Sequence, residues 1–251
     1  LCDAHEWEGA CAGALEPLDP WIAEWEGAAD IPEDLWRLNQ SPDGQQHYLP
    51  LQYVVLYLYY RPDMLDAAGV EPPTDFASFL QAAKATTTDD VYGFGMRGAG
   101  GGHDHWGTFV LGGGATFEPG GMVTDEALAA NRWFLELNSE HGVFSPSAPT
   151  DGFSQIIDNF KSGHTAMTIH HIGSANGMVE VLGENVSAVP VPRSPDGGGW
   201  TAFGDESSNA VFAASDVKDA AWEWVSFLSE AEANVAFTEL TGQLTVTTSG
   251  A

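Results

Sequence analysis

The sequence has little positive charge and lacks any long apolar run. Lysine and arginine together number 8 among 251 residues, against 36 aspartates and glutamates, and the formal net charge is −28. A surface with this charge repels phosphate backbones and anionic lipid headgroups. The longest apolar run, 53–60, is too short to span a bilayer and suits a buried strand. The sequence therefore predicts no nucleic-acid partner and no electrostatic docking on a membrane.

The excess of acidic residues has two interpretations. Only 18% of the residues are charged, yet almost all of that charge is negative. Either the charge keeps an ordinary secreted protein soluble, or it is an adaptation to high salt, where screening relieves repulsion between carboxylates. Composition does not decide between them, and we prefer the first.

Cysteine is scarce as well. Cys2 and Cys11 are too few to define a disulfide framework, and they lack the spacing of a metal site. They pair with each other in an oxidising compartment, or they are two buried free thiols. Both alternatives stay open.

Motifs for nucleotide and hydrolase chemistry are also missing. Residues 93–98 match G-x-G-x-x-G, but further glycines follow where a dinucleotide site needs a helix N-terminus. The sequence contains no P-loop, no G-x-S-x-G turn and no H-E-x-x-H helix. We therefore expect no enzymatic activity and no cofactor.

What is present is an alternation of short apolar runs with amphipathic stretches, which predicts an α/β protein. Pro62 and Gly69 are expected to begin and end a short helix, and Thr74 to cap a helix that runs to about Ala85. Further helices are expected after the cap Thr124 and over 153–160. The expected extended segments are 47–60, 92–96, 165–169, 186–190 and 209–213.

A later helix, expected to begin after Ser215, has one apolar stripe at helical spacing. We expect this stripe to be the buried side of the helix. It consists of Val217, Ala220, Ala221, Trp224, Val225 and Leu228.

Four segments together resemble one family. The segment "GALEPLDPWI" is followed by "YLPLQYVVLYLYYRPDMLDAAGVEPPTDFASFLQAAK", "FKSGHTAMTIHH" and "AAWEWVSFLSEAEA". Their order and spacing are similar to those of the extracellular solute-binding proteins of ABC importers, in the sugar-binding branch that includes maltose-binding protein. The resemblance begins after the family's first βαβ unit and ends before its last helices. We therefore expect these residues to be the central part of a larger protein.

The resemblance implies a type II periplasmic-binding-protein fold, with two α/β lobes and a ligand cleft between them. The first lobe is expected to contain residues 1–54 and 205–251, and the second lobe residues 55–204. The crossing segments would lie near 52–56 and 201–208. It also implies an extracellular, periplasmic or lipid-anchored monomer that binds a sugar and docks on the permease subunits of the transporter.

The resemblance and the chemistry of sugar recognition together indicate candidate ligand residues. Sugars are bound by aromatic faces and by planar polar side chains. The candidates are His5, Glu6, Trp7, Gln52, Tyr53, Arg97, His103, His105, Trp106, His170, His171, Trp200 and Asp205.

Four of these candidates, Arg97, His103, Trp106 and His171, follow the ends of predicted strands. Because strand ends converge in α/β folds, we expect the four to line one concavity. Arg97 is one of only five arginines, and its fork suits hydroxyls or a carboxylate.

Several candidates have a structural alternative. Trp7 and Trp106 are equally suited to anchor the helices that they open, and Tyr53 could pack between strands. Arg97 could form a surface ion pair with one of many acids.

A second function stays open at this point. His103 and His105, together with His170 and His171, could converge on a metal ion in a secreted metal-binding protein or metal-dependent enzyme. Polar clusters beside glycine-rich loops are more often hydrogen-bonding groups, so we prefer the sugar-binding interpretation.

Overall fold

The computed structural model describes residues 13–41, 44–195 and 204–251, and these residues form two compact units. Unit 1 contains the described residues up to Val54 and those from Gly204 to Ala251. Unit 2 begins at Val55 and contains the described residues between these two parts. The chain therefore leaves unit 1 within one strand and returns to it at the start of another. None of the helices in these ranges is long and apolar enough to cross a membrane.

The sheet of unit 2 brings together segments that are far apart in the sequence. Its strands are β1 (Leu49–Tyr60), β2 (Tyr92–Gly95), β3 (Thr165–His171) and β4 (Ser187–Pro190), in the order β2-β3-β1-β4. Strands β2 and β3 are parallel, while β1 is antiparallel to both β3 and β4. Strand β5 (Gly204–Asn209) pairs with β1 outside this path.

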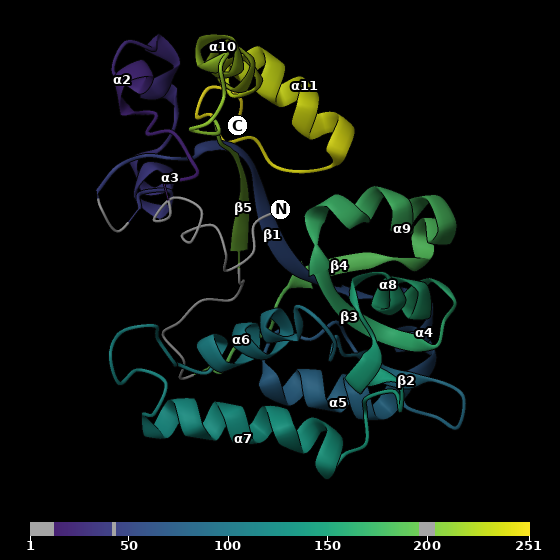
Figure 1. The fold of residues 1–251 in the computed structure, drawn as a ribbon. Coiled ribbons are helices and arrows are strands. Elements are labelled where there is room, and N and C mark those ends of the chain that lie inside the picture. The colour runs from purple at the N-terminus through teal and green to yellow at the C-terminus, as the bar shows by residue number, and fades with distance from the viewer. Residues whose placement is uncertain (1–12, 42–43, 196–203) are drawn as a thin grey trace. The chain divides into compact units, whose positions relative to one another are not determined.

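Helices of unit 2 pack on both faces of this sheet (Figure 1). Alternate residues of β1 point to opposite faces, so Leu58 joins one apolar cluster and Tyr59 the other. The larger cluster contains Phe79, Phe94 and Phe109. The helices are α4 (Pro62–Ala68), α5 (Phe76–Thr86), α6 (Gly102–Gly112), α7 (Asp125–Ser139), α8 (Phe153–Lys161) and α9 (Ala175–Leu182), with 3-10 turns at Ala148–Thr150, Ile172–Ser174 and Gly183–Asn185.

Unit 1 has its own core around Leu18, Leu35 and Leu49. The indole of Trp222 stacks on Trp21 at a centroid distance of 6.0 Å and meets the ring of Trp25 edge-on at 5.8 Å. The elements of this unit, besides β5, are α2 (Asp19–Ile22), a 3-10 helix (Glu26–Asp30), α3 (Glu33–Leu38), α10 (Lys218–Leu228) and α11 (Ala231–Thr241).

Two predicted helix features agree with the structure. Gly69 ends α4 in the left-handed conformation, with φ of 67°. The hydroxyl of Thr124 caps α7 by accepting from the amide of Ala127. Both are local signals that need no tertiary contact to take effect.

The predicted cap at Thr74 is wrong by one residue. Helix α5 is capped by Asp75, whose carboxylate accepts from the amide of Ser78 at 2.8 Å. The hydroxyl of Ser78 returns the contact by accepting from the amide of Asp75 at 3.0 Å. This reciprocal pair satisfies two amides that the helix itself cannot bond, and it fixes the start of the helix.

The predicted strand over 209–213 is also wrong. Strand β5 ends at Asn209, and beyond it only Phe212 forms an isolated bridge, with Leu15. Val211 packs in the core of unit 1 without belonging to a strand, while Phe212 is 69% exposed.

The predicted buried stripe of α10 is partly wrong. Val225 is buried, but Val217 and Trp224 are 66% and 61% exposed. The helix instead buries Trp222, because its indole fits between Trp21 and Trp25. The apolar residues of α10 form two overlapping stripes, and periodicity alone favours the stripe with Trp224 over the one with Trp222.

Candidate functional site

A group of polar side chains lies where the parallel strands β2 and β3 end. The last paired residues of the two strands are Gly95 and Thr168. Arg97 follows β2 by two residues, and His170 and His171 are the last residues of β3. Polar residues at the carboxyl ends of neighbouring parallel strands are thereby brought to one edge of the sheet, which is where open α/β folds place ligands.

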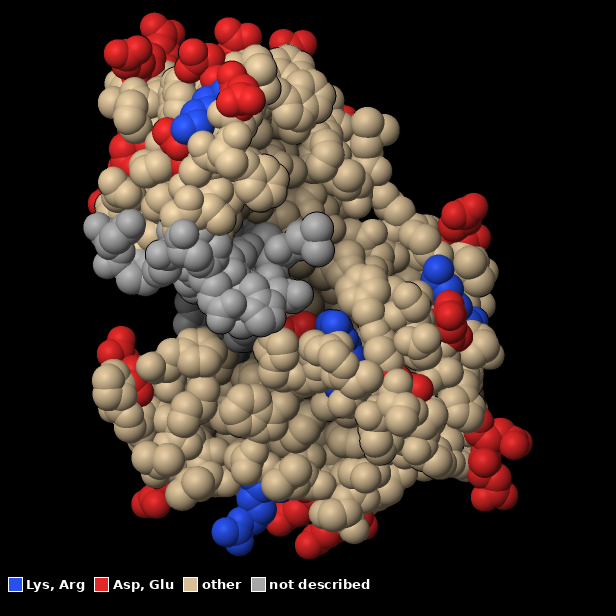
Figure 2. Space-filling view, viewed as in Figure 1, with Lys and Arg blue, Asp and Glu red and all other residues tan. Residues whose placement is uncertain are grey.

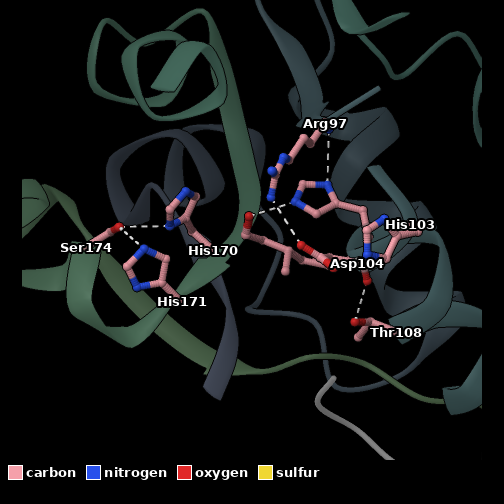
Figure 3. A network of polar contacts seen from close by, with 9 residues as sticks. Arg97, His103, Asp104, Thr108, His170, His171 and Ser174 are labelled. Atoms are coloured by element: carbon pink, nitrogen blue, oxygen red, sulfur yellow. Dashed lines mark hydrogen bonds and ion pairs between the residues drawn. The ribbon is translucent and has the colours of Figure 1, made fainter. Parts of the chain in front are cut away.

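Arg97 pairs with an acidic residue of the helix that follows it. Its Nη1 lies 3.1 Å from a carboxylate oxygen of Asp104, in the first turn of α6. His103 Nε2 lies 3.2 Å from the other oxygen of the same carboxylate. Burial raises the pKa of Asp104, and the neighbouring His103 and Arg97 oppose that rise. Figure 3 shows Arg97, His103 and Asp104 grouped at the start of this helix.

The glycine-rich loop leaves room for the Arg97 side chain. Gly101 has φ of +86°, and a Cβ atom there would lie 2.0 Å from Nη2 of Arg97. A Cβ atom at Gly102 would lie 2.6 Å from the Arg97 carbonyl oxygen. The guanidinium therefore packs directly against the backbone of these glycines, which have no Cβ atom to exclude it.

His105 is buried beneath this arrangement, with 2% of its surface exposed. Its Nδ1 lies 3.2 Å from the amide nitrogen of Arg97, and its Nε2 lies 2.8 Å from the carbonyl oxygen of Ile169. Burial lowers the pKa of this imidazole to about 3. Both ring nitrogens are occupied by main-chain groups, so His105 has no nitrogen left for a metal ion or a ligand.

His170 and His171 form the second half of the group. Ser174 Oγ lies 2.8 Å from His170 Nδ1 and 3.3 Å from His171 Nε2, which holds the two rings together (Figure 3). Burial lowers the pKa of His170 to about 3, and it also lowers that of His171. Both imidazoles are therefore neutral at pH 7, and each has one donor and one acceptor for hydrogen bonds.

An aromatic ring joins the two halves. Phe153, the first residue of α8, stacks on His171 at a centroid distance of 5.2 Å and meets the ring of His170 at 4.3 Å. The guanidinium carbon of Arg97 lies 5.4 Å from the centre of the same ring. Phe153 is nevertheless 44% exposed, so part of its ring faces outward from the group.

Sequence reasoning missed Phe153 as a site residue. Phe153, Ile156 and Phe160 share one side of α8, and the latter two are fully buried. Periodicity therefore assigns all three to the core. No local signal distinguishes Phe153, because its exposure depends on Arg97 and His171, which come from other elements.

Trp106 is partly buried and packs against the core of unit 2. Its indole packs between two apolar clusters, and its Nε1 donates to Asn131 Oδ1 at 2.7 Å. These contacts are those of a helix anchor, the structural alternative for this residue. The contacts described above among Arg97, His103 and His171 do not involve Trp106.

The remaining predicted ligand residues lie in unit 1 or outside the described residues. Gln52 Nε2 donates to Ser207 Oγ at 3.2 Å, and Tyr53 packs on the unit 1 core while its main chain pairs with Leu244. Asp205 belongs to β5, and the structure does not describe its side chain. His5, Glu6, Trp7 and Trp200 fall in ranges that the structure does not describe.

The group combines polar side chains with an aromatic face. Within the described ranges, no three His, Cys, Asp or Glu side chains are grouped so as to hold a metal. Arg97 Nε is buried without a hydrogen-bond partner in those ranges, and Ser174 bonds one nitrogen of each of the neutral imidazoles of His170 and His171. Beside them stands the face of Phe153, which suits the apolar side of a ring.

Comparison with known proteins identifies the family. Residues 2–235 match the family of bacterial extracellular solute-binding proteins. A binding protein of Brucella abortus (strain 2308) is 27% identical over an alignment of 249 residues, and the match covers 93% of this chain and 58% of that protein.

Solved structures agree in fold. A solute-binding protein of an ABC transporter from Thermotoga lettingae, bound with α-D-tagatose, matches with a TM-score of 0.84 and 20% identity, over 96% of this chain and 64% of its own. The GacH receptor of Streptomyces glaucescens, solved unliganded and with acarbose, matches with a TM-score of 0.81 and 25% identity, over 98% and 64%.

These structures confirm the predicted fold class, the α/β type II fold of two-lobe solute-binding proteins. The chain spans less than two thirds of the length of the relatives that it matches. The match over nearly all of its residues establishes that the chain belongs to the family of bacterial extracellular solute-binding proteins.

Proposed function

We propose that the protein binds a sugar or polyol outside the cell and delivers it to the permease subunits of an ABC importer. In this proposal it acts without catalysis, as a monomer, and a lipid anchor on the full-length precursor holds it at the cell surface. Arg97, Phe153 and His171 bind the sugar from unit 2.

The exposed ring of Phe153 between Arg97 and His171 carries this proposal. The C–H faces of a sugar ring pack on aromatic surfaces, while its hydroxyls take hydrogen bonds from planar groups at the rim. Neutral imidazoles can both donate to and accept from hydroxyls, and the Arg97 charge is balanced by Asp104. The group thus suits a neutral polyhydroxyl compound better than an ion.

Proteins of the same fold give independent support. The matching structures include proteins solved with tagatose, acarbose, maltose and D-mannitol. The GacH receptor, which binds acarbose, is 25% identical to this chain. The family match and these ligands favour a carbohydrate over the divalent metal considered from the sequence.

A thermal-shift screen of the protein tests the proposal. The panel contains mono-, di- and oligosaccharides, sugar alcohols and divalent cations at equal concentrations. A compound that binds only the folded state raises the melting temperature in proportion to the logarithm of its concentration above Kd. We expect one class of sugar or polyol to raise it and the cations to leave it unchanged. A shift with a cation and none with any sugar would contradict the proposal.

A further inference from the structure

The imidazole of His105 forms hydrogen bonds with two main-chain groups, one at each ring nitrogen. Its Nδ1 lies 3.2 Å from the amide nitrogen of Arg97, and its Nε2 lies 2.8 Å from the carbonyl oxygen of Ile169. The first group belongs to the extension of β2 and the second to β3. The side chain therefore links the two strands at the edge where the site lies.

These two contacts fix the form of the ring. A main-chain amide only donates, so Nδ1 must be the acceptor and carries no proton. A carbonyl oxygen only accepts, so Nε2 must carry the proton. His105 is thus the neutral Nε2–H tautomer, since an imidazolium could not accept from Arg97. The lowered pKa of this buried ring agrees with that assignment.

The ring replaces a direct contact between the strands. The β2–β3 pairing ends at Gly95 and Thr168, where the Thr168 hydroxyl also donates to the Gly95 carbonyl at 2.9 Å. One step further, the imidazole links the strands in the opposite sense: it accepts from the Arg97 amide after β2 and donates to the Ile169 carbonyl on β3. The strand ends are thereby held apart by a ring without leaving either main-chain group unbonded.

The consequence falls on Arg97. Its amide is bonded to His105, its guanidinium pairs with Asp104, and the Gly101 backbone lies against that guanidinium. His105 is 2% exposed, so it cannot itself touch a bound molecule. Any influence that it has on binding must act through the neighbours that it holds.

We propose that His105 is a positioning residue that holds the main chain of Arg97 at the end of β2 and so sets the guanidinium beside Phe153. This inference rests on the proposed function only for its importance to sugar binding. The placement of Arg97 is a property of the unliganded protein and can be measured without a sugar.

Two substitutions separate the two contacts of the ring. The amide oxygen of His105→Asn can take the place of Nδ1 and accept from Arg97, while the contact to Ile169 is lost. The amide nitrogen of His105→Gln reaches the place of Nε2 and donates to Ile169, while the contact to Arg97 is lost. Both variants lose one hydrogen bond and the same buried ring, so a purely structural role predicts the same behaviour for both.

Hydrogen exchange of the Arg97 amide, followed by NMR, is the readout. We expect exchange to accelerate about tenfold or more in His105→Gln and to stay within about threefold of wild type in His105→Asn. The amide of Tyr92, which donates to His164 at the other end of β2, is the internal reference and should be unchanged in both. Equal acceleration at Arg97 in the two variants would overturn the proposal.

The ¹⁵N spectrum of the His105 ring in the wild-type protein keeps the proposal testable if neither variant folds. We expect a protonated Nε2 and an unprotonated Nδ1 at pH 7. A proton on Nδ1 would show that Arg97 cannot donate to this ring, and the proposal would fall. Neither measurement contains a sugar, so a negative sugar screen would contradict the proposed function and leave the role of His105 standing.

Discussion

At the scale of single residues, the site depends on how Arg97 is held. The guanidinium contacts Asp104 and Phe153, and it lies against the backbone of the glycine-rich loop. The loop is therefore more than a flexible connection, because one glycine in it gives the guanidinium its space.

Substitution of Gly101 by alanine should displace Arg97. The new Cβ atom would meet the end of a flexible side chain, which can move at low cost, so the main effect should be on the site. We expect weaker sugar binding and a shifted Arg97 Nε–H resonance, together with a loss of about 1–2 kcal/mol of stability from the positive φ.

Gly120→Ala is the matched control for this substitution. Gly120 has φ of +87°, against +86° for Gly101, and a Cβ atom there meets nothing within 4 Å. It should lose the same stability and leave the Arg97 resonance unmoved. If both variants shift the Arg97 resonance alike, or neither does, then the glycine at position 101 does not determine where the Arg97 guanidinium lies.

Sequence reasoning could find the polar residues of the site better than their roles. Arg97, His103 and His171 follow strand ends, and the topology of the sheet brings such positions together. The role of His105 could not be predicted, because its partners Arg97 and Ile169 are main-chain groups of two other segments. The exposure of Phe153 depends on the same tertiary arrangement.

At the scale of elements, local signals decided the helix ends. At the start of α5, the carboxylate of Asp75 accepts from the amide and the hydroxyl of Ser78, and that hydroxyl also accepts from the amide of Asp75. These hydrogen bonds from Ser78 lower the pKa of Asp75. Thr74 was the predicted cap, but its amide merely donates to Ser78 Oγ.

Replacement of Asp75 by alanine should therefore destabilise the protein by about 1 kcal/mol, as is typical of a lost cap. Thr74→Ala, one residue earlier, should change the stability little. Urea unfolding of both variants at pH 7 makes the comparison. The carboxylate stabilises α5 only while ionised, so the Asp75→Ala deficit should disappear in acid, once the pH falls through the lowered pKa. A larger loss for Thr74→Ala would contradict the assigned cap.

Elements whose limits depend on tertiary contacts were harder to predict. The apolar segment 209–213 reads as a strand, yet Val211 is apolar because it enters the unit 1 core. The orientation of α10 depends on the fit of Trp222 between Trp21 and Trp25, which are far away in the sequence. Propensity and periodicity describe a segment by itself and contain no information on such partners.

At the scale of the whole molecule, negative charge dominates. On the face shown in Figure 2, each group of Lys or Arg atoms lies beside Asp or Glu atoms. Some of the few basic side chains already form ion pairs, such as Arg61–Asp63 and Lys218–Glu16. Most carboxylates therefore have no cation to pair with, since 36 acidic residues face 8 basic ones, and they repel one another.

Salt should stabilise the protein by screening this repulsion. Raising sodium chloride from about 0.01 M to 1 M shortens the Debye length from about 30 Å to 3 Å. We expect the melting temperature at pH 7 to rise over this range. The rise should shrink near pH 4, where many carboxylates are protonated. A melting temperature that is independent of salt at pH 7 would show that self-repulsion is unimportant, and it would remove the argument for a high-salt adaptation.

The most direct test of the central claim is a calorimetric titration of Phe153→Ala with the sugar that gives the largest shift in the screen. Loss of the aromatic platform should weaken binding by about tenfold or more, with little loss of stability because Phe153 is 44% exposed. Phe117→Ala, at a position 72% exposed in the same unit, is the control and should bind like wild type. Unchanged affinity in Phe153→Ala would contradict the assignment of the site to the ends of β2 and β3.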